Sequence, residues 1–257
     1  MLDAGYWILD IGCWISDARF LVKPNMKRIS AHSRNALLSI LSDIDISVPS
    51  RGSNRTTEHT ERWSICRLLS TLAWENKLDY PCVGRKSERP DYVFRLGVQG
   101  VGIEITEAVK EDLARTEVLP EANSSSVIDI SLFRWRDRRK TLDELRQIAK
   151  KTKLTGPGWV GDEPEQEFAD AISDKVENKT RKLNEDTFSR FNEDWLVIYE
   201  NLALPALEKN NAASYLCLSL ANYWGLNAFQ RIFVESGEFI IELTSERLAM
   251  YRICDLW

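Results

Sequence analysis

The sequence contains few cysteines, few histidines and no long hydrophobic run. Its five cysteines are scattered, and only two histidines occur in 257 residues. Zinc sites need closely spaced cysteine and histidine ligands, so neither a zinc site nor a disulfide scaffold is expected. Dispersed cysteines are typical of a reducing compartment, and we expect a cytoplasmic protein. With so few histidines, a serine or cysteine hydrolase built on a catalytic triad is also disfavoured.

No segment approaches the roughly 20 apolar residues of a membrane-spanning helix. The longest apolar runs, at about 5–15 and 215–226, are short and contain polar residues, and the start has no basic region typical of a signal peptide. No membrane partner is therefore expected. The chain also lacks a basic excess, since 34 lysines and arginines face 39 aspartates and glutamates. This balance disfavours binding along nucleic acid irrespective of sequence, so any such contact should be local.

The length fits one large domain with added segments. Residues 1–50 are expected to form an N-terminal extension, in which an apolar segment at 1–25 adds a strand or helix and a helical pattern opens at Met26. Residues 51–257 are expected to form a single α/β domain. Within it, residues 110–161 combine weak secondary-structure signals with a Gly-Pro-Gly turn, and we treat them as an insertion.

The periodicity of apolar residues predicts a helix, three strands, a second helix, a strand, a third helix and two further strands. This order is typical of an α/β fold with a mixed sheet. The first helix is expected to begin at about Thr57, and the next two at 164–183 and 206–223. The strands are expected at 78–83, 91–96, 101–109, 195–199, 231–234 and 239–243, with a further candidate strand inside the insertion at 127–133.

Two carboxylates are expected to converge on one side of the predicted hairpin. Asp91 begins one strand, and Glu104 lies midway along its partner, where apolar and other residues alternate between the two faces. Glu61 falls beside the apolar stripe of the first helix, from which it could reach the same place. Carboxylate oxygens are preferred ligands of hard divalent cations, so this arrangement favours Mg²⁺ or Mn²⁺.

Two lysines lie on or near the core-facing side of the helix predicted at 164–183. When the helix is projected, Lys179 falls inside the apolar arc and Lys175 at its edge. Such lysines either extend past the core to solvent or point toward a polar site on the sheet that the helix covers.

The segments 89–94 (RPDYVF) and 102–106 (GIEIT) resemble the motif of the PD-(D/E)xK, restriction-endonuclease-like nuclease superfamily. The preceding helix and the later strand 195–199 (WLVIY) occur in matching order, so the resemblance covers about a third of the chain. It implies a mixed central sheet flanked by helices, with a restriction-endonuclease-like core and an insertion. It also implies phosphodiester hydrolysis of nucleic acid, with DNA favoured over RNA. Many nucleases of that superfamily act as homodimers, although this sequence has no heptad pattern or exposed apolar stripe that indicates one.

The resemblance further implies the residues of the site. Asp91, Glu104, the carbonyl of Ile105 and Glu61 match the metal ligands of the superfamily. The motif lysine is replaced by Thr106, which carries no charge, so Lys179 or Lys175 would have to act in its place, with Lys110 a weaker choice. If none reaches the carboxylates, the alternative is a catalytically inactive nuclease-fold protein that binds nucleic acid or protein.

A basic segment lies within the expected insertion. Between Arg134 and Lys153 there are nine basic and three acidic residues, a local excess of six positive charges, and Trp135 is interleaved with the arginines. Such a segment is typical of a nucleic-acid contact, although a solvated helix face has the same composition. The candidate nucleic-acid-binding residues are Arg134, Arg136, Arg138, Arg139 and Lys140.

Overall fold

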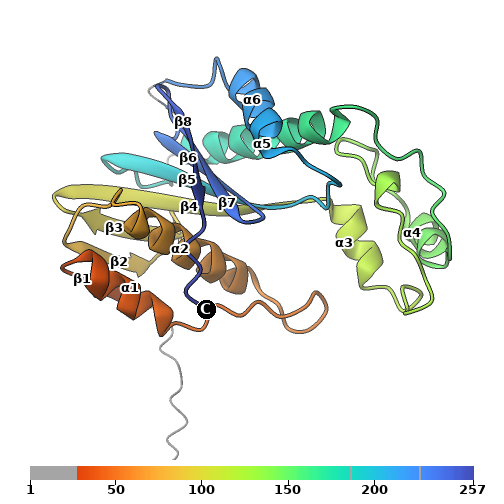
Figure 1. The fold of residues 1–257 in the computed structure, drawn as a ribbon, viewed down its shortest axis with the longest axis horizontal. Coiled ribbons are helices and arrows are strands. Elements are labelled where there is room, and N and C mark those ends of the chain that lie inside the picture. The colour runs from red at the N-terminus through yellow and green to blue at the C-terminus, as the bar shows by residue number, and fades with distance from the viewer. Residues whose placement is uncertain (1–27, 186, 226) are drawn as a thin grey trace, which may run out of the picture.

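The computed structural model describes residues 28–185, 187–225 and 227–257, and the predicted apolar segment at 1–25 lies outside the described residues. Eight strands form one mixed sheet in which spatial order follows chain order (Figure 1). The first four strands are antiparallel, β4, β5 and β6 are parallel, and the last three are antiparallel. The strands are β1 (Arg28–Ala31), β2 (Cys82–Lys86), β3 (Tyr92–Leu96), β4 (Gln99–Val109), β5 (Glu193–Asn201), β6 (Arg231–Ser236), β7 (Phe239–Leu243) and β8 (Leu248–Arg252).

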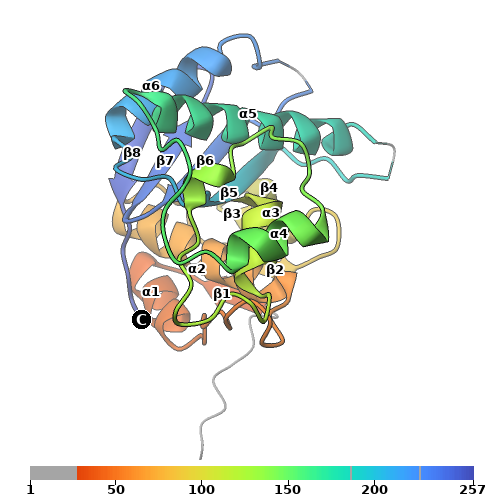
Figure 2. The same cartoon turned by 90° about the vertical axis from the view of Figure 1, so that its right-hand side faces the viewer.

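Helices cover both faces of the sheet (Figure 1). The helices α1 (Arg34–Ser42) and α2 (Thr57–Trp74) lie on one face, and α5 (Glu163–Leu183) and α6 (Lys209–Ser219) lie on the other. The short helices α3 (Glu111–Glu117) and α4 (Leu142–Ala149) lie beyond the end of the sheet in Figure 1 and face the viewer in Figure 2. A 3₁₀ turn at Ile130–Leu132 lies between them in the chain. Among the described residues, no helix has the length and apolar character needed to span a bilayer.

Each face of the sheet has its own apolar core. Alternate residues of β4, Val101, Ile103 and Ile105, pack with α1 and α2, because successive side chains of a strand point to opposite faces. In β5, Val197 belongs to this core and Leu196 to the core beneath α5 and α6. The nearly continuous apolar sequence of β5 therefore reflects a central strand that is buried on both faces.

The predicted α/β class and mixed sheet are confirmed, and the predicted hairpin at 91–109 and helix at 164–183 agree with β3, β4 and α5. The strand predicted at 78–83 was wrong in position, since β2 begins only after Pro81, which lacks the N–H that a ladder position needs. The strand predicted at 127–133 was also wrong. Asp129 accepts a hydrogen bond from the Ser131 N–H and turns the chain into the 3₁₀ helix.

Other differences lie at the two ends of the sheet. The helical pattern expected from Met26 begins later, because Arg28–Ala31 pairs with β2 as an edge strand and Ser33 caps α1. The helix predicted at 206–223 is shorter, because the Glu208 side chain caps it at its start. The sequence patterns did not identify β8, an edge strand whose exposed and partly buried residues carry little apolar signal.

The predicted insertion folds as a small unit of its own. Its buried apolar residues come from α3, α4 and the segment between them, and they are Leu113, Phe133, Leu145 and Ile148. This unit follows directly on β4 and leads directly into α5. It therefore stands at the end of β4 at which the predicted carboxylates lie.

Candidate functional site

Asp91 and Glu104 lie next to each other where β3 begins. Tyr92 pairs with Ile103, and from Glu104 onward β4 runs past the start of β3 and pairs only with β5. The Ile105 N–H therefore has no partner in β3, and it donates instead to Asp91 Oδ2 at 2.7 Å. This bond fixes the Asp91 carboxylate at the free edge of β4.

Lys179 reaches this place from α5. Its Nζ lies 2.5 Å from Glu104 Oε1 and donates to the Ile105 carbonyl oxygen at 3.2 Å. Glu104 faces α5 because its neighbours Ile103 and Ile105 point toward α2. The side chains of Lys179 and Glu104 are 17% and 11% exposed, so the pair is largely shielded from solvent.

The environment of Asp91 opposes its negative charge. Burial, followed by the nearby Glu104 charge, raises the pKa of Asp91 to about 7, although the hydrogen bond from the Ile105 N–H lowers it. A carboxylic acid with this pKa is only partly ionised at neutral pH. Carboxyl groups perturbed by burial and a like charge are concentrated at functional sites, and a bound cation would reverse the shift.

Asp91, Ile105 and Lys179 line a cleft of about 560 Å³. Its walls come from the loop before α2, the start of α2, the end of β4, α3 and α5. Among the predicted site residues, it contains Asp91, Ile105, Glu61 and Lys179. The other lining residues are Arg51, Gly52, Arg55, Thr56, Thr57, Thr60, Thr106, Glu107, Ala114, Arg115 and Val118.

The donor atoms at this site are oxygens, which suit a hard divalent cation. Asp91, Glu104 and the Ile105 carbonyl are brought together, whereas Glu61 lies 3.2 Å from Lys86 Nζ and is paired with it. In the described part of the chain, no group of three or more His, Cys, Asp or Glu side chains is arranged to hold a metal ion. Two carboxylates and a carbonyl would suit a cation such as Mg²⁺, which binds few protein ligands and retains waters.

The other two candidate lysines lie elsewhere. Lys175, one helical turn before Lys179, lies with its Nζ 5.6 Å from the ring centre of Trp135 and lines a second cavity, of about 300 Å³. Lys110 is buried and forms an ion pair with Glu167 at 2.7 Å. Of the three, only Lys179 contacts the carboxylate site.

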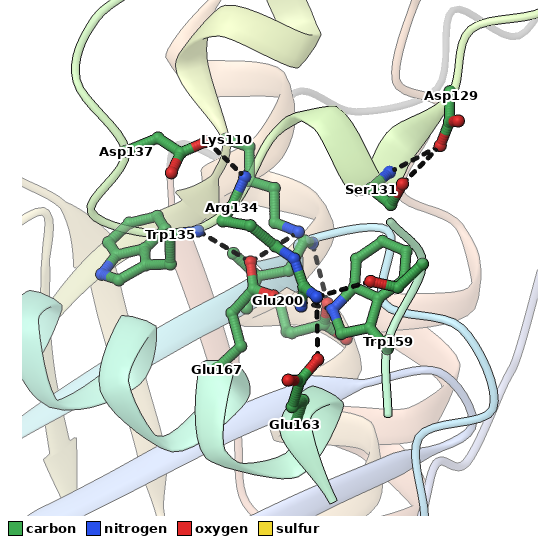
Figure 3. Close-up of polar contacts among 12 residues, drawn as sticks. Lys110, Asp129, Ser131, Arg134, Trp135, Asp137, Trp159, Glu163, Glu167 and Glu200 are labelled. Atoms are coloured by element: carbon green, nitrogen blue, oxygen red, sulfur yellow. Dashed lines mark hydrogen bonds and ion pairs between the residues drawn. The ribbon is translucent and has the colours of Figure 1, made fainter. Parts of the chain in front are cut away.

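Most of the predicted nucleic-acid-binding cations are already paired with carboxylates. Arg134 contacts two glutamates of α5, as Figure 3 shows, and Arg136 contacts two aspartates of the same helix. Arg138 and Lys140 are paired within the insertion. The Arg139 side chain makes no ion pair or hydrogen bond with the residues that the structure describes, and it lines the second cavity. Acidic residues of α5 thus offset much of the local positive charge.

Two arginines that the sequence patterns did not indicate lie in the wall of the cleft. Arg51 Nη2 and Arg55 Nη2 lie 2.7 and 3.0 Å from the same atom, Glu107 Oε1. The turn between them contains Gly52, whose φ of +87° favours glycine. Two arginines four residues apart in a loop before a helix were the available signal, but the sequence does not show which carboxylate they contact.

Comparison of the chain with protein-family models, with curated proteins and with solved structures found no match in any of the three.

Proposed function

We propose that the chain is a metal-dependent phosphodiesterase that hydrolyses nucleic acid, DNA before RNA, through a site of the PD-(D/E)xK type. The observation that carries the proposal is the convergence of Asp91, Glu104 and Lys179 around Ile105 at the free edge of β4. The succession of α2, β2, β3, β4, α5 and β5 supports it, because the restriction-endonuclease-like core implied by the sequence has a helix, a three-stranded meander, a helix and a parallel strand.

In this proposal, each group of the site has a separate role in hydrolysis. Asp91, Glu104 and the Ile105 carbonyl would hold Mg²⁺ or Mn²⁺, with Glu61 as a further ligand if it leaves Lys86. A bound cation of this kind would polarise the phosphate and make a water more acidic. Lys179 orients Glu104 and places a positive charge where negative charge develops on the phosphate oxygens during hydrolysis. The Ile105 N–H keeps Asp91 in place throughout.

A binding module without chemistry is the second candidate function. The observation that favours it is the position of the Lys179 ammonium group, which contacts both Glu104 and the Ile105 carbonyl, two of the proposed ligands. In this case the ion pair would stabilise the fold, and the cleft would bind a partner without cleaving it. A homodimer would be compatible with either function.

The test is a cleavage assay on single- and double-stranded DNA and RNA, with Mg²⁺, with Mn²⁺ or with EDTA. We expect metal-dependent cleavage by the wild type and a loss of about 100-fold or more in Glu104→Gln and in Lys179→Met. Glu88→Gln, the same change at an exposed residue three positions before Asp91, should cleave normally. Cleavage that persists in EDTA or in both site variants would refute the proposal, and no cleavage by the wild type would favour the binding module.

A further inference from the structure

Arg51 and Arg55 are held rigidly in the wall of the cleft. Their guanidinium groups converge on Glu107 Oε1, and Arg55 Nη2 also donates to Thr60 Oγ1 at 3.1 Å. The side chains are only 24% and 16% exposed. Two planar donors fixed in this way can bind an anion without first losing side-chain freedom.

The charges of this pair are not balanced. Glu107 offers one negative charge to the two guanidinium groups, and it also accepts a hydrogen bond from Asn201 Nδ2. In the described part of the chain, the remaining carboxylate paired with either arginine is Glu117, which lies 3.8 Å from Arg51 Nε and is 47% exposed. This exposed contact is weak, so the less exposed part of the cluster holds two guanidinium groups against the single carboxylate of Glu107.

The other cations that line the cleft differ in this respect. Lys179 is paired with Glu104, and Arg115 with Asp112 at 2.9 Å. Each of these contacts joins one cation to one carboxylate. Among the cations that line the cleft, Arg51 and Arg55 are thus the two that share one carboxylate.

The two arginines contact β4 close to the proposed site of hydrolysis. Glu107 is two residues beyond Ile105, whose N–H binds Asp91, which corresponds to about 7 Å along a strand. That distance is comparable with the separation of consecutive phosphates in an extended nucleic-acid strand. Arg51, Arg55, Asp91 and Lys179 all line the same cleft.

We propose that Arg51 and Arg55 bind a phosphodiester group of the substrate, adjacent to the one that is hydrolysed. The inference rests on the proposed function and deepens it. Guanidinium groups match phosphate oxygens in geometry, and one excess positive charge matches the single negative charge of a diester. A terminal phosphate monoester carries nearly two charges and would be only partly neutralised. The strand would therefore continue past the scissile bond on the side of Arg51 and Arg55.

Binding without metal tests the assignment separately from cleavage. The measurement is fluorescence anisotropy of a 12-nucleotide fluorescein-labelled DNA strand in EDTA, for the wild type and for Arg51→Gln/Arg55→Gln. We expect the double variant to bind at least about tenfold more weakly, with the salt dependence reduced by one to two ions. The control, Arg95→Gln/Arg252→Gln, removes two exposed arginines outside the cleft and should bind within about twofold of the wild type.

A charge-conserving variant and a strand with a different end complete the test. Arg55→Lys keeps the charge and loses the planar fork, so it should show an intermediate loss even if the double variant fails to fold. Strands with a 5′-phosphate or a 5′-hydroxyl should bind equally well. Equal binding by the wild type and both cleft variants would overturn the proposal, and so would an arginine-dependent preference for the 5′-phosphate.

The outcomes separate the two proposals. Arginine-dependent binding by a protein that never cleaves with Mg²⁺ or Mn²⁺ would support the phosphate site and refute the phosphodiesterase. Metal-dependent cleavage together with arginine-independent binding would support the phosphodiesterase and refute the phosphate site.

Discussion

The elements β4 and α5 are joined by two lysine–glutamate contacts with opposite arrangement. At the carboxylate site, Glu104 lies on β4 and Lys179 on α5. At the base of the insertion, Lys110 follows β4 and Glu167 lies on α5. Glu167 is in contact with four donors (Figure 3), which are Lys110 Nζ, Arg134 Nη1, the Trp135 N–H and Trp159 Nε1. Burial opposes its ionisation, but the hydrogen bonds from Lys110 and Trp159 outweigh it and lower the pKa of Glu167.

The pKa of Asp91 is shifted in the opposite direction from that of Glu167. Asp91 accepts a hydrogen bond from one backbone N–H and lies beside Glu104, so that burial and a like charge raise its pKa to about 7. The comparison teaches that burial alone does not mark a functional group. Glu167 is buried but fully satisfied, and it anchors the insertion to α5. Asp91 keeps an unfavourable environment that a bound cation would relieve.

The largest expected change in the free energy of unfolding comes from removing the charge of Glu167. Glu167→Gln removes the charge that compensates Lys110 and Arg134, and breaking such a buried pair costs about 3–5 kcal/mol. Urea denaturation of wild type and variant measures the difference. Glu163→Gln, which removes the outer and more exposed partner of the same arginine, should shift the midpoint far less. Equal shifts in the two variants would contradict a special role for Glu167.

The second prediction is a variant that is more stable than the wild type, by an amount that depends on pH. Because folding raises the pKa of Asp91, its protonated form contributes stability that is complete below pH 3.8 and is lost as the pH rises to about 7. Asp91→Asn imitates the protonated form at every pH. It should therefore unfold with a free energy about 2–4 kcal/mol higher than the wild type at pH 8, and the difference should fall toward zero near pH 4.

A second aspartate provides the control. Asp129 accepts hydrogen bonds from Ser131, Thr155 and Gly156, with the Ser131 side chain as the main cause of a pKa lowered to about 2. Asp129→Asn should therefore destabilise the protein at pH 8, and the loss should diminish as the pH falls toward 2. Urea denaturation across this pH range would show the two variants diverging in opposite directions, and parallel curves would contradict the comparison.

The smallest effect concerns the one candidate cation of the insertion that has no partner among the described residues. Arg139→Ala should weaken binding of a DNA strand by about two- to threefold, as expected for a single exposed phosphate contact. Anisotropy in EDTA measures this change. An unchanged affinity would place the insertion outside the binding surface, and a loss as large as that of Arg51→Gln/Arg55→Gln would move the principal phosphate contact there.

The sequence predicted those parts of the site that depend on local geometry. Asp91 and Glu104 meet because a short turn sets the hairpin register, and Lys179 follows from the face of one helix. Arg51 could not be assigned, because its role depends on how a loop packs against the end of a strand more than fifty residues later. The pairing of the basic segment with α5 was likewise hidden, because it depends on how the insertion folds back.

The chain order of the sheet has a consequence for synthesis on the ribosome. Every strand from β2 onward pairs with the strand that precedes it in the chain, so the sheet can grow by addition at one edge. Asp91, Glu104 and Lys179 all precede β5, and the strands β6, β7 and β8 are added later. The proposed centre can therefore be assembled while the last quarter of the protein is still being made.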